Sequence, residues 1–115
     1  MQTGLPLTER EAERLADTMF ALSAPSRVQI LSCLLDGPHA VTDIIEILGM
    51  EQSAVSHQLR VLRDHNLVKG EQVGRHRVYA LHDEHVRSLF EEALRHVQHE
   101  SAGSPVRRRV SGGGG

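Results

Sequence analysis

The fold of this chain is decided by residues 41–70, which read VTDIIEILGMEQSAVSHQLRVLRDHNLVKG. Apolar residues at helical spacing predict a short helix from about Val41 to Leu48, and Gly49 ends it in the left-handed conformation that favours glycine. A longer helix is predicted from about Gln52 to His65. The residues expected on its buried side lie at i, i+4 and i+7, and they are Val55, Leu59 and Leu62. Two short helices joined by a tight turn at a glycine indicate a helix-turn-helix.

A β-hairpin is predicted directly after these helices. Leu67 to Lys69 and Arg77 to Leu81 have the pattern of two strands around a turn that contains Gly74. A hairpin in this position is the wing of a winged helix-turn-helix. The expected fold class is therefore mainly α with a β-hairpin, a winged helix-turn-helix that is dimeric because one short helix recognises bases only weakly.

Three further helices complete the expected order of elements. Thr8 and Glu11 form a capping-box pattern that begins an amphipathic helix. The apolar stripe of this first helix comprises Ala12, Leu15, Ala16, Met19 and Leu22. Pro25 begins the second helix, because proline is favoured at the first helical position. A fifth helix is predicted from about Asp83 to Glu100.

Composition limits the class of protein. The 115 residues leave room for one hydrophobic core, so we expect one DNA-binding and dimerisation domain over residues 8–100, a flexible N-terminus over 1–7 and a disordered tail over 101–115. No stretch approaches the roughly 18 apolar residues needed to cross a membrane. The single cysteine, Cys33, excludes an internal disulfide framework and fits the cytoplasm, the expected location. The formal net charge is −2, so DNA binding must depend on local charge.

Polar and basic side chains cover the outer face of the fourth predicted helix and the hairpin. From Ser53 to Ala80 there are five Lys or Arg residues against two acids, a local excess of +3. Such a face can be merely solvated, but here it belongs to the second helix of a helix-turn-helix beside a basic hairpin. We therefore expect a homodimer bound to an inverted repeat in double-stranded operator DNA. The candidate DNA-binding residues are Gln52, Ser53, Ser56, His57, Arg60, Arg75, His76 and Arg77.

Four candidate metal ligands lie at the fifth helix, namely Asp83, His85, His96 and His99. A single surface histidine is usually solvated, but these ligands follow one stripe, and His96 and His99 are i, i+3 neighbours. His85 and His96 are roughly 16 Å apart along the axis, too far to share an ion within one chain. Two antiparallel copies of the helix would form two sites per homodimer, each with three imidazoles and one carboxylate. This donor set suits tetrahedral zinc or cobalt, and His82 is a weaker accessory candidate.

Several segments together resemble one family. Residues 52–63, QSAVSHQLRVLR, closely resemble the recognition helix of the ArsR/SmtB family of metal-sensing repressors. Residues 24–27, APSR, and residues 74–79, GRHRVY, resemble the start of its second helix and its wing. The pairs Asp83-x-His85 and His96-x-x-His99 are similar to the C-terminal-helix site of its zinc and cobalt sensors.

This resemblance implies a mechanism of regulation. The apo dimer would bind an inverted-repeat operator and repress a metal efflux or resistance gene, and zinc at the dimer interface would release the DNA. In the family, the residue matching His96 passes a hydrogen bond toward backbone near the position matching His57. The resemblance thus implies a link between the metal site and the recognition helix.

Departures from the family pattern reduce the number of metals that this chain is expected to bind. Members that sense soft metals or arsenic carry cysteines where this chain has Ala40 to Asp43, which argues against cadmium, lead and arsenite. Nickel sensors recruit extra ligands from the termini. Here no histidine lies in the N-terminus or after His99, so zinc is favoured over nickel. Cobalt or nickel sensing by the same fold stays open, as does a purely structural metal.

Redox sensing and catalysis have weaker support. Cys33 lies among apolar residues of the second helix, which indicates a buried, inert thiol. A catalytic zinc site keeps an open position, whereas the four candidate ligands would close the shell. No Ser/His/Asp pattern or glycine-rich phosphate loop is present in the sequence. We therefore expect no enzyme.

Overall fold

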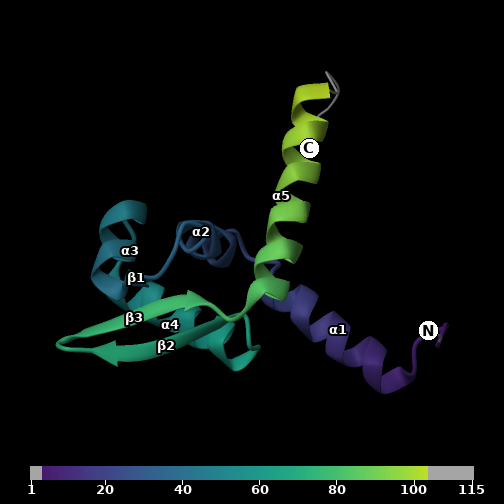
Figure 1. The fold of residues 1–115 in the computed structure, drawn as a ribbon, viewed down its shortest axis with the longest axis horizontal. Helices are drawn as coiled ribbons and strands as arrows, with labels where there is room; N and C mark the ends of the chain where they lie inside the picture. The colour runs from purple at the N-terminus through teal and green to yellow at the C-terminus, as the bar shows by residue number, and fades with distance from the viewer. Residues whose placement is uncertain (1–3, 104–115) are drawn as a thin grey trace. The chain divides into compact units, whose positions relative to one another are not determined.

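The computed structural model describes residues 4–103, with the side chains of residues 4–99. It divides the chain into two compact units, one ending at Asp83 and one beginning at Glu84, and each is described by itself. The first unit, over its described residues, consists of four helices and a three-stranded antiparallel sheet (Figure 1). Its elements are α1 (Glu9–Ala21), α2 (Pro25–Cys33), β1 (His39–Ala40), α3 (Val41–Leu48), α4 (Gln52–Asp64), β2 (Val68–Val73) and β3 (His76–Leu81).

The predicted helix boundaries in this unit are confirmed by local contacts. The Glu11 N–H donates to Thr8 Oγ1 at 3.1 Å, and the Thr8 N–H donates to Glu11 Oε1 at 3.0 Å, which completes the capping box of α1. Pro25 occupies the first turn of α2. Gly49 has a φ of 66° and its N–H donates to the Ile45 carbonyl at 2.8 Å, so it ends α3 in the left-handed conformation.

The sheet is larger than the predicted hairpin. Its strand order is β1-β3-β2, and the β2–β3 hairpin turns at Gly74, whose φ is 60°. Strand β1 was not predicted, because a two-residue strand has no periodicity and is defined only by its pairing of His39 with Tyr79 and Ala40 with Val78. The predicted first strand of the hairpin ended at Lys69, whereas β2 continues through four more residues of the wing.

Gly70 gives the wing its close packing at the middle of the hairpin. It pairs with Tyr79 of β3, and a Cβ at Gly70 would lie 2.8 Å from Tyr79 Cε2. The absence of a side chain at Gly70 therefore makes room for the buried tyrosine ring.

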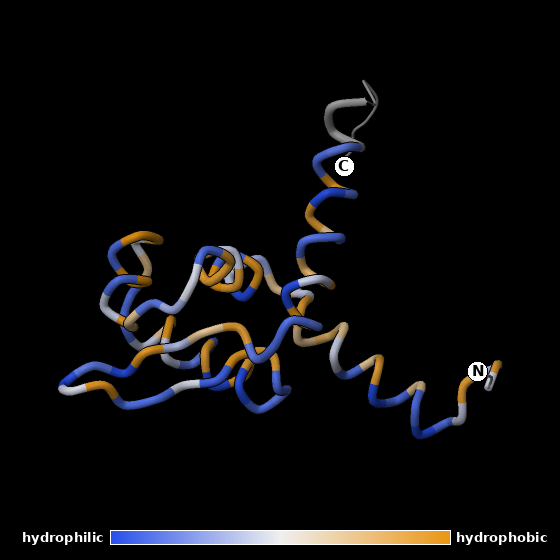
Figure 2. Tube along the Cα trace, in the orientation of Figure 1, coloured by the Kyte–Doolittle hydropathy of each residue, from blue (hydrophilic) through white to orange (hydrophobic). Residues whose placement is uncertain are grey.

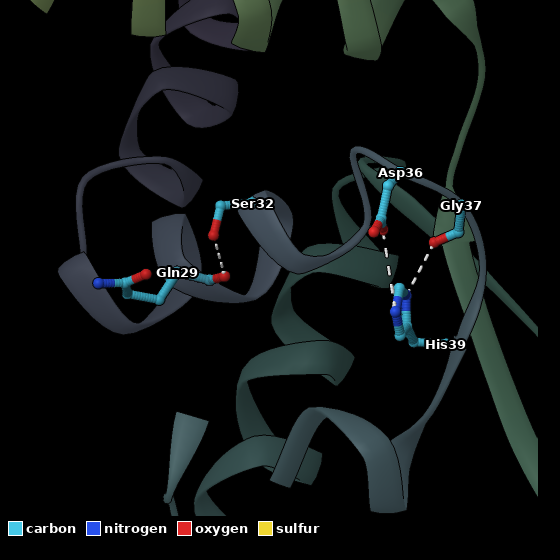
Figure 3. Close-up of polar contacts among 5 residues, drawn as sticks. All are labelled: Gln29, Ser32, Asp36, Gly37 and His39. Atoms are coloured by element: carbon cyan, nitrogen blue, oxygen red, sulfur yellow. Dashed lines mark hydrogen bonds and ion pairs between the residues drawn. The ribbon is translucent and has the colours of Figure 1, made fainter. Parts of the chain in front are cut away.

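His39 stabilises the turn that leads into β1 (Figure 3). Its Nδ1 donates to the Gly37 carbonyl at 3.0 Å, and its Nε2 lies 3.8 Å from Asp36 Oδ1. These two contacts give His39 a structural role. In the preceding helix, Ser32 Oγ donates to the Gln29 carbonyl at 2.6 Å.

The hydrophobic core of the first unit is formed by α2, α3, α4 and the sheet. Its fully buried large side chains are Ile30, Leu31, Leu34, Ile44, Val55, Leu59, Leu62 and Val68. The predicted inward stripe of α4 is thus confirmed. By contrast, α1 buries only Ala21, and its apolar Leu15 and Met19 are each 48% exposed. The trace of α1 changes repeatedly between hydrophobic and hydrophilic residues (Figure 2), as in an amphipathic helix, but its apolar stripe is not part of this core.

The second unit is the helix α5 (Glu84–Gly103). It begins one residue later and ends three residues later than expected. The predicted flexible N-terminus lies partly outside the described residues, and the predicted tail lies outside them from residue 104 onward. Over residues 4–103, no helix is long and apolar enough to cross a membrane.

Candidate nucleic-acid interface and metal ligands

The helix-turn-helix orients α4 by burying one of its sides. Val55, Leu59 and Leu62 are each 0% exposed, so their side chains fix the rotation of the helix about its axis. The turn at Gly49 joins α3 to α4, and the two helices pack on each other and on α2. The opposite side of α4 is therefore directed away from the core.

The outer face of α4 carries most of the predicted DNA-binding residues of this helix. Gln52, Ser53, His57 and Arg60 are exposed, and Ser56 is half-buried. Amide, hydroxyl, imidazole and guanidinium groups are the donors and acceptors that contact base edges and phosphates in a major groove. The helix thus presents a surface with the chemistry of a recognition helix.

The wing places its basic residues beside α4. Arg75, His76 and Arg77 are exposed at and after the hairpin turn, and the Arg77 guanidinium carbon lies 5.8 Å from the centroid of the Tyr79 ring. A cation over an aromatic face is attracted by the ring quadrupole, which restrains Arg77 near the tip of the wing, where it pairs with Gln72.

A groove of about 360 Å³ lies between α4, the start of α3 and the wing. Six predicted DNA-binding residues line it, and they are Gln52, Ser56, Arg60, Arg75, His76 and Arg77. Ser53 and His57 are exposed on α4 but do not line this groove. Four arginines meet in the groove, so its charge complements a DNA phosphate.

Two polar residues of the groove were missed by the sequence analysis. Arg63 of α4 and Thr42 of α3 both line it. Arg63 could have been found, because it lies seven residues after Ser56 and so on the same helix face. Its guanidinium also lies 3.6 Å from Asp64 Oδ1, in an exposed ion pair that solvent screens. Thr42 had no sequence signal, since only tertiary packing brings α3 to the wing.

The four predicted metal ligands lie at or just before α5. Asp83 immediately precedes the helix, and His85, His96 and His99 are part of it. All four side chains are exposed. Among the described residues of one chain, no three His, Cys, Asp or Glu side chains are close enough to hold a metal ion together. Their donor chemistry suits zinc or cobalt, and a site that uses all four stays a prediction for two chains together.

Comparison with known proteins places this fold among transcription regulators. A family model described as bacterial regulatory protein, arsR family, matches residues 24–69. The chain is 50% identical to the HTH-type transcriptional regulator NmtR of Mycobacterium tuberculosis over 107 residues, 93% of this chain and 89% of that protein. It is 41% identical to a transcriptional repressor SmtB homolog of Synechocystis over 88 residues, 76% of this chain and 67% of that protein.

Solved structures agree with these sequence similarities. The solution structure of apo-NmtR is similar with a TM-score of 0.72, covering 91% of this chain and 88% of that one at 50% identity. A homodimeric winged helix-turn-helix DNA-binding domain from Mycobacterium bovis, a possible ArsR-family transcriptional regulator, is similar with a TM-score of 0.74 and 27% identity. It covers 91% of this chain and 99% of that domain. The predicted winged helix-turn-helix is thereby confirmed.

Proposed function

This chain belongs to the arsR family of bacterial regulatory proteins, and on that premise we propose that it is a homodimeric, metal-responsive transcriptional repressor. Its partner is double-stranded operator DNA with an inverted repeat. Transcription regulators bind DNA and catalyse no reaction, and a bacterial repressor acts in the cytoplasm. We propose residues 8–100 as the domain that binds DNA and dimerises.

The observation that carries this proposal is the groove between α4 and the wing. Recognition by one short helix is weak, so phosphate contacts from a second element are needed to fix its register on the duplex. Four arginines from α4 and the wing line one groove beside the exposed polar face of α4. That combination supports α4 as the base-contacting helix and the wing as its backbone-contacting partner.

The exposed apolar residues of the helices outside the core support a second copy of this chain as the partner. On α1, Leu15 and Met19 are each 48% exposed, and on α5, Leu89 and Val97 are 40% and 57% exposed. Burial of such side chains against a second copy removes apolar surface from water. The structurally similar domain from Mycobacterium bovis is homodimeric.

The metal proposed for this dimer is zinc, held by Asp83 and His85 of one chain and His96 and His99 of its partner. A bound zinc ion would join the two chains through these ligands. The ligands at the two ends of one α5 then belong to two different metal sites. Zinc would therefore restrain both α5 helices, and this restraint would change the distance between the two α4 helices of the dimer. Because binding is reciprocal, DNA must weaken zinc binding by the factor by which zinc weakens DNA binding.

The test is a fluorescence-anisotropy titration of the full chain onto its upstream intergenic DNA at fixed salt. With chelator we expect tight binding, and with zinc we expect weaker binding. Repeating the titration with cobalt and nickel ranks the metals. If nickel weakens DNA binding more than zinc does, nickel replaces zinc as the proposed metal. Binding that requires zinc would instead make the metal structural, and binding that zinc leaves unchanged would overturn metal sensing.

A further inference from the structure

Arg27 of α2 joins three helices of the first unit. Its Nε donates to the Ala21 carbonyl at 2.6 Å, and its Nη2 donates to the Phe20 carbonyl at 3.2 Å, both in the last turn of α1. Its Nη1 donates to Gln58 Oε1 of α4 at 2.9 Å. The guanidinium carbon also lies 6.0 Å from the centroid of the Phe20 ring. One side chain therefore connects the end of α1 to the helix that carries the DNA-binding residues.

The bond to Ala21 satisfies a carbonyl at the C-terminal end of α1, where a helix leaves its last carbonyls without partners inside the helix. The Phe20 carbonyl also accepts from the Ser23 N–H at 3.0 Å and from Ser23 Oγ at 2.6 Å. The last turn of α1 contains no basic residue of its own, so Arg27 supplies the positive charge that this end of the helix dipole favours. Elsewhere α1 is weakly attached, because Ala21 is its one buried residue and it is not among the elements that pack closely on one another. Arg27 is thus a principal connection between α1 and the rest of the unit.

The bond to Gln58 is on a flank of α4. Gln58 is half-buried and lies between the exposed His57 and the buried Leu59. A rotation or sliding of α4 relative to the end of α1 would change the length and angle of this 2.9 Å bond. The guanidinium is planar and donates in a fixed fork, so its bonds to α1 and to α4 are not adjusted independently.

We propose that Arg27 is a positioning residue that transmits the placement of α1 in the dimer to α4, and thereby sets affinity for the operator. The inference rests on the proposed function, since it takes α4 as the base-contacting helix and the exposed face of α1 as a dimer surface. Arg27 itself does not line the groove between α4 and the wing. We therefore expect Arg27 to affect the affinity for operator DNA and not the general attraction of the protein to DNA phosphates.

The test compares Arg27→Gln, Gln58→Ala and their double variant in binding to operator DNA and to unrelated DNA of equal length. We expect Arg27→Gln to weaken operator binding about tenfold and to leave binding to unrelated DNA within about twofold. Gln58→Ala should give a similar loss, and the double variant should lose no more than Arg27→Gln alone. The matched control is Arg10→Gln, which removes an exposed arginine of α1 and should change neither affinity.

Thermal unfolding separates this role from a merely structural one. A lowered Tm with an unchanged ratio of operator affinity to unrelated-DNA affinity would overturn the inference, and so would additive losses in the double variant. If Arg27→Gln fails to fold, Gln58→Ala alone decides, because an unchanged ratio in that variant overturns the inference as well. Wild-type chain that fails to bind the operator overturns the proposed function itself, which distinguishes the two failures.

Discussion

Helices α1 and α4 are both 13 residues long and amphipathic, yet one chain uses them differently. The apolar stripe of α4 is 0% exposed at Val55, Leu59 and Leu62, whereas Leu15 and Met19 of α1 are each 48% exposed. The pattern of apolar residues predicts which side of a helix is buried. It does not predict whether the same chain or a second chain covers that side. In α4 the covering surface is the core of the same chain, and for α1 we propose a second copy.

The largest expected difference between the two helices is in folding. Leu59→Ala should lower the free energy of unfolding by about 3 kcal/mol, because it leaves a cavity in a closed core. Leu15→Ala should lower it by less than about 1 kcal/mol at low protein concentration. Urea denaturation followed by circular dichroism measures both. Equal losses in the two variants would show that α1 belongs to the core after all.

The next difference concerns association. Leu15→Ser combined with Met19→Ser should raise the dissociation constant of the dimer at least about tenfold, since it removes two apolar side chains from the proposed interface. Sedimentation equilibrium measures this constant, with Glu13→Ser on the same helix as the matched control. An unchanged monomer–dimer equilibrium would remove α1 from the interface.

A smaller effect is expected on the outer face of α4. Arg63→Gln should weaken binding to all DNA sequences about fivefold and reduce the salt dependence by about one phosphate contact. Arg10→Gln, which removes an exposed charge from α1, should change the salt dependence much less. Anisotropy titrations over a range of salt concentrations measure both slopes. If Arg63→Gln and Arg10→Gln had the same salt dependence, Arg63 would make no phosphate contact in the groove, and its effect would come only from the loss of one positive charge.

The smallest effect is expected at Cys33, at the end of the helix that supports α4. Burial, and secondly the charge of Asp36, raise the pKa of the Cys33 thiol above its ordinary value. The reactive thiolate is therefore scarcer at neutral pH than in an exposed cysteine, and alkylation should accelerate only as the pH rises toward that raised pKa.

Asp36→Asn removes the second cause, so the pKa should fall and alkylation by iodoacetamide at pH 8 should become about twofold faster. Mass spectrometry over time measures the rate. Because the thiol is mostly protonated, Cys33→Ser should leave the response of DNA binding to metal unchanged. A rate that falls in Asp36→Asn would contradict this assignment of causes.

Features that depend on neighbouring residues in the sequence could be predicted. The capping box of Thr8 and Glu11, the left-handed Gly49 and the buried stripe of α4 each follow from local spacing, and all three are confirmed. Features that depend on contacts across the fold could not be predicted. The strand β1 exists only through its pairing with β3, and Thr42 reaches the groove only because α3 packs beside the wing.

The candidate sites divide in the same way. Six of the eight predicted DNA-binding residues line one groove. Helix periodicity predicts that those of α4 share a face, and the hairpin turn groups those of the wing, but that both sets line one groove depends on packing across the fold. The metal ligands stay a prediction, because one chain does not bring them together among its described residues. Their spacing would close a metal site only between two antiparallel copies of α5, which stays part of the proposal.

The most direct test of the account compares wild-type chain with His96→Asn in operator binding, with chelator and then with zinc. Wild-type chain should bind the operator tightly with chelator and lose between about 5-fold and 150-fold in affinity with zinc. His96→Asn should bind equally tightly with chelator and show no loss with zinc, because one of the four ligands is gone. Release of His96→Asn from DNA by zinc, to the same extent as wild-type chain, would contradict the proposed site and the regulation built on it.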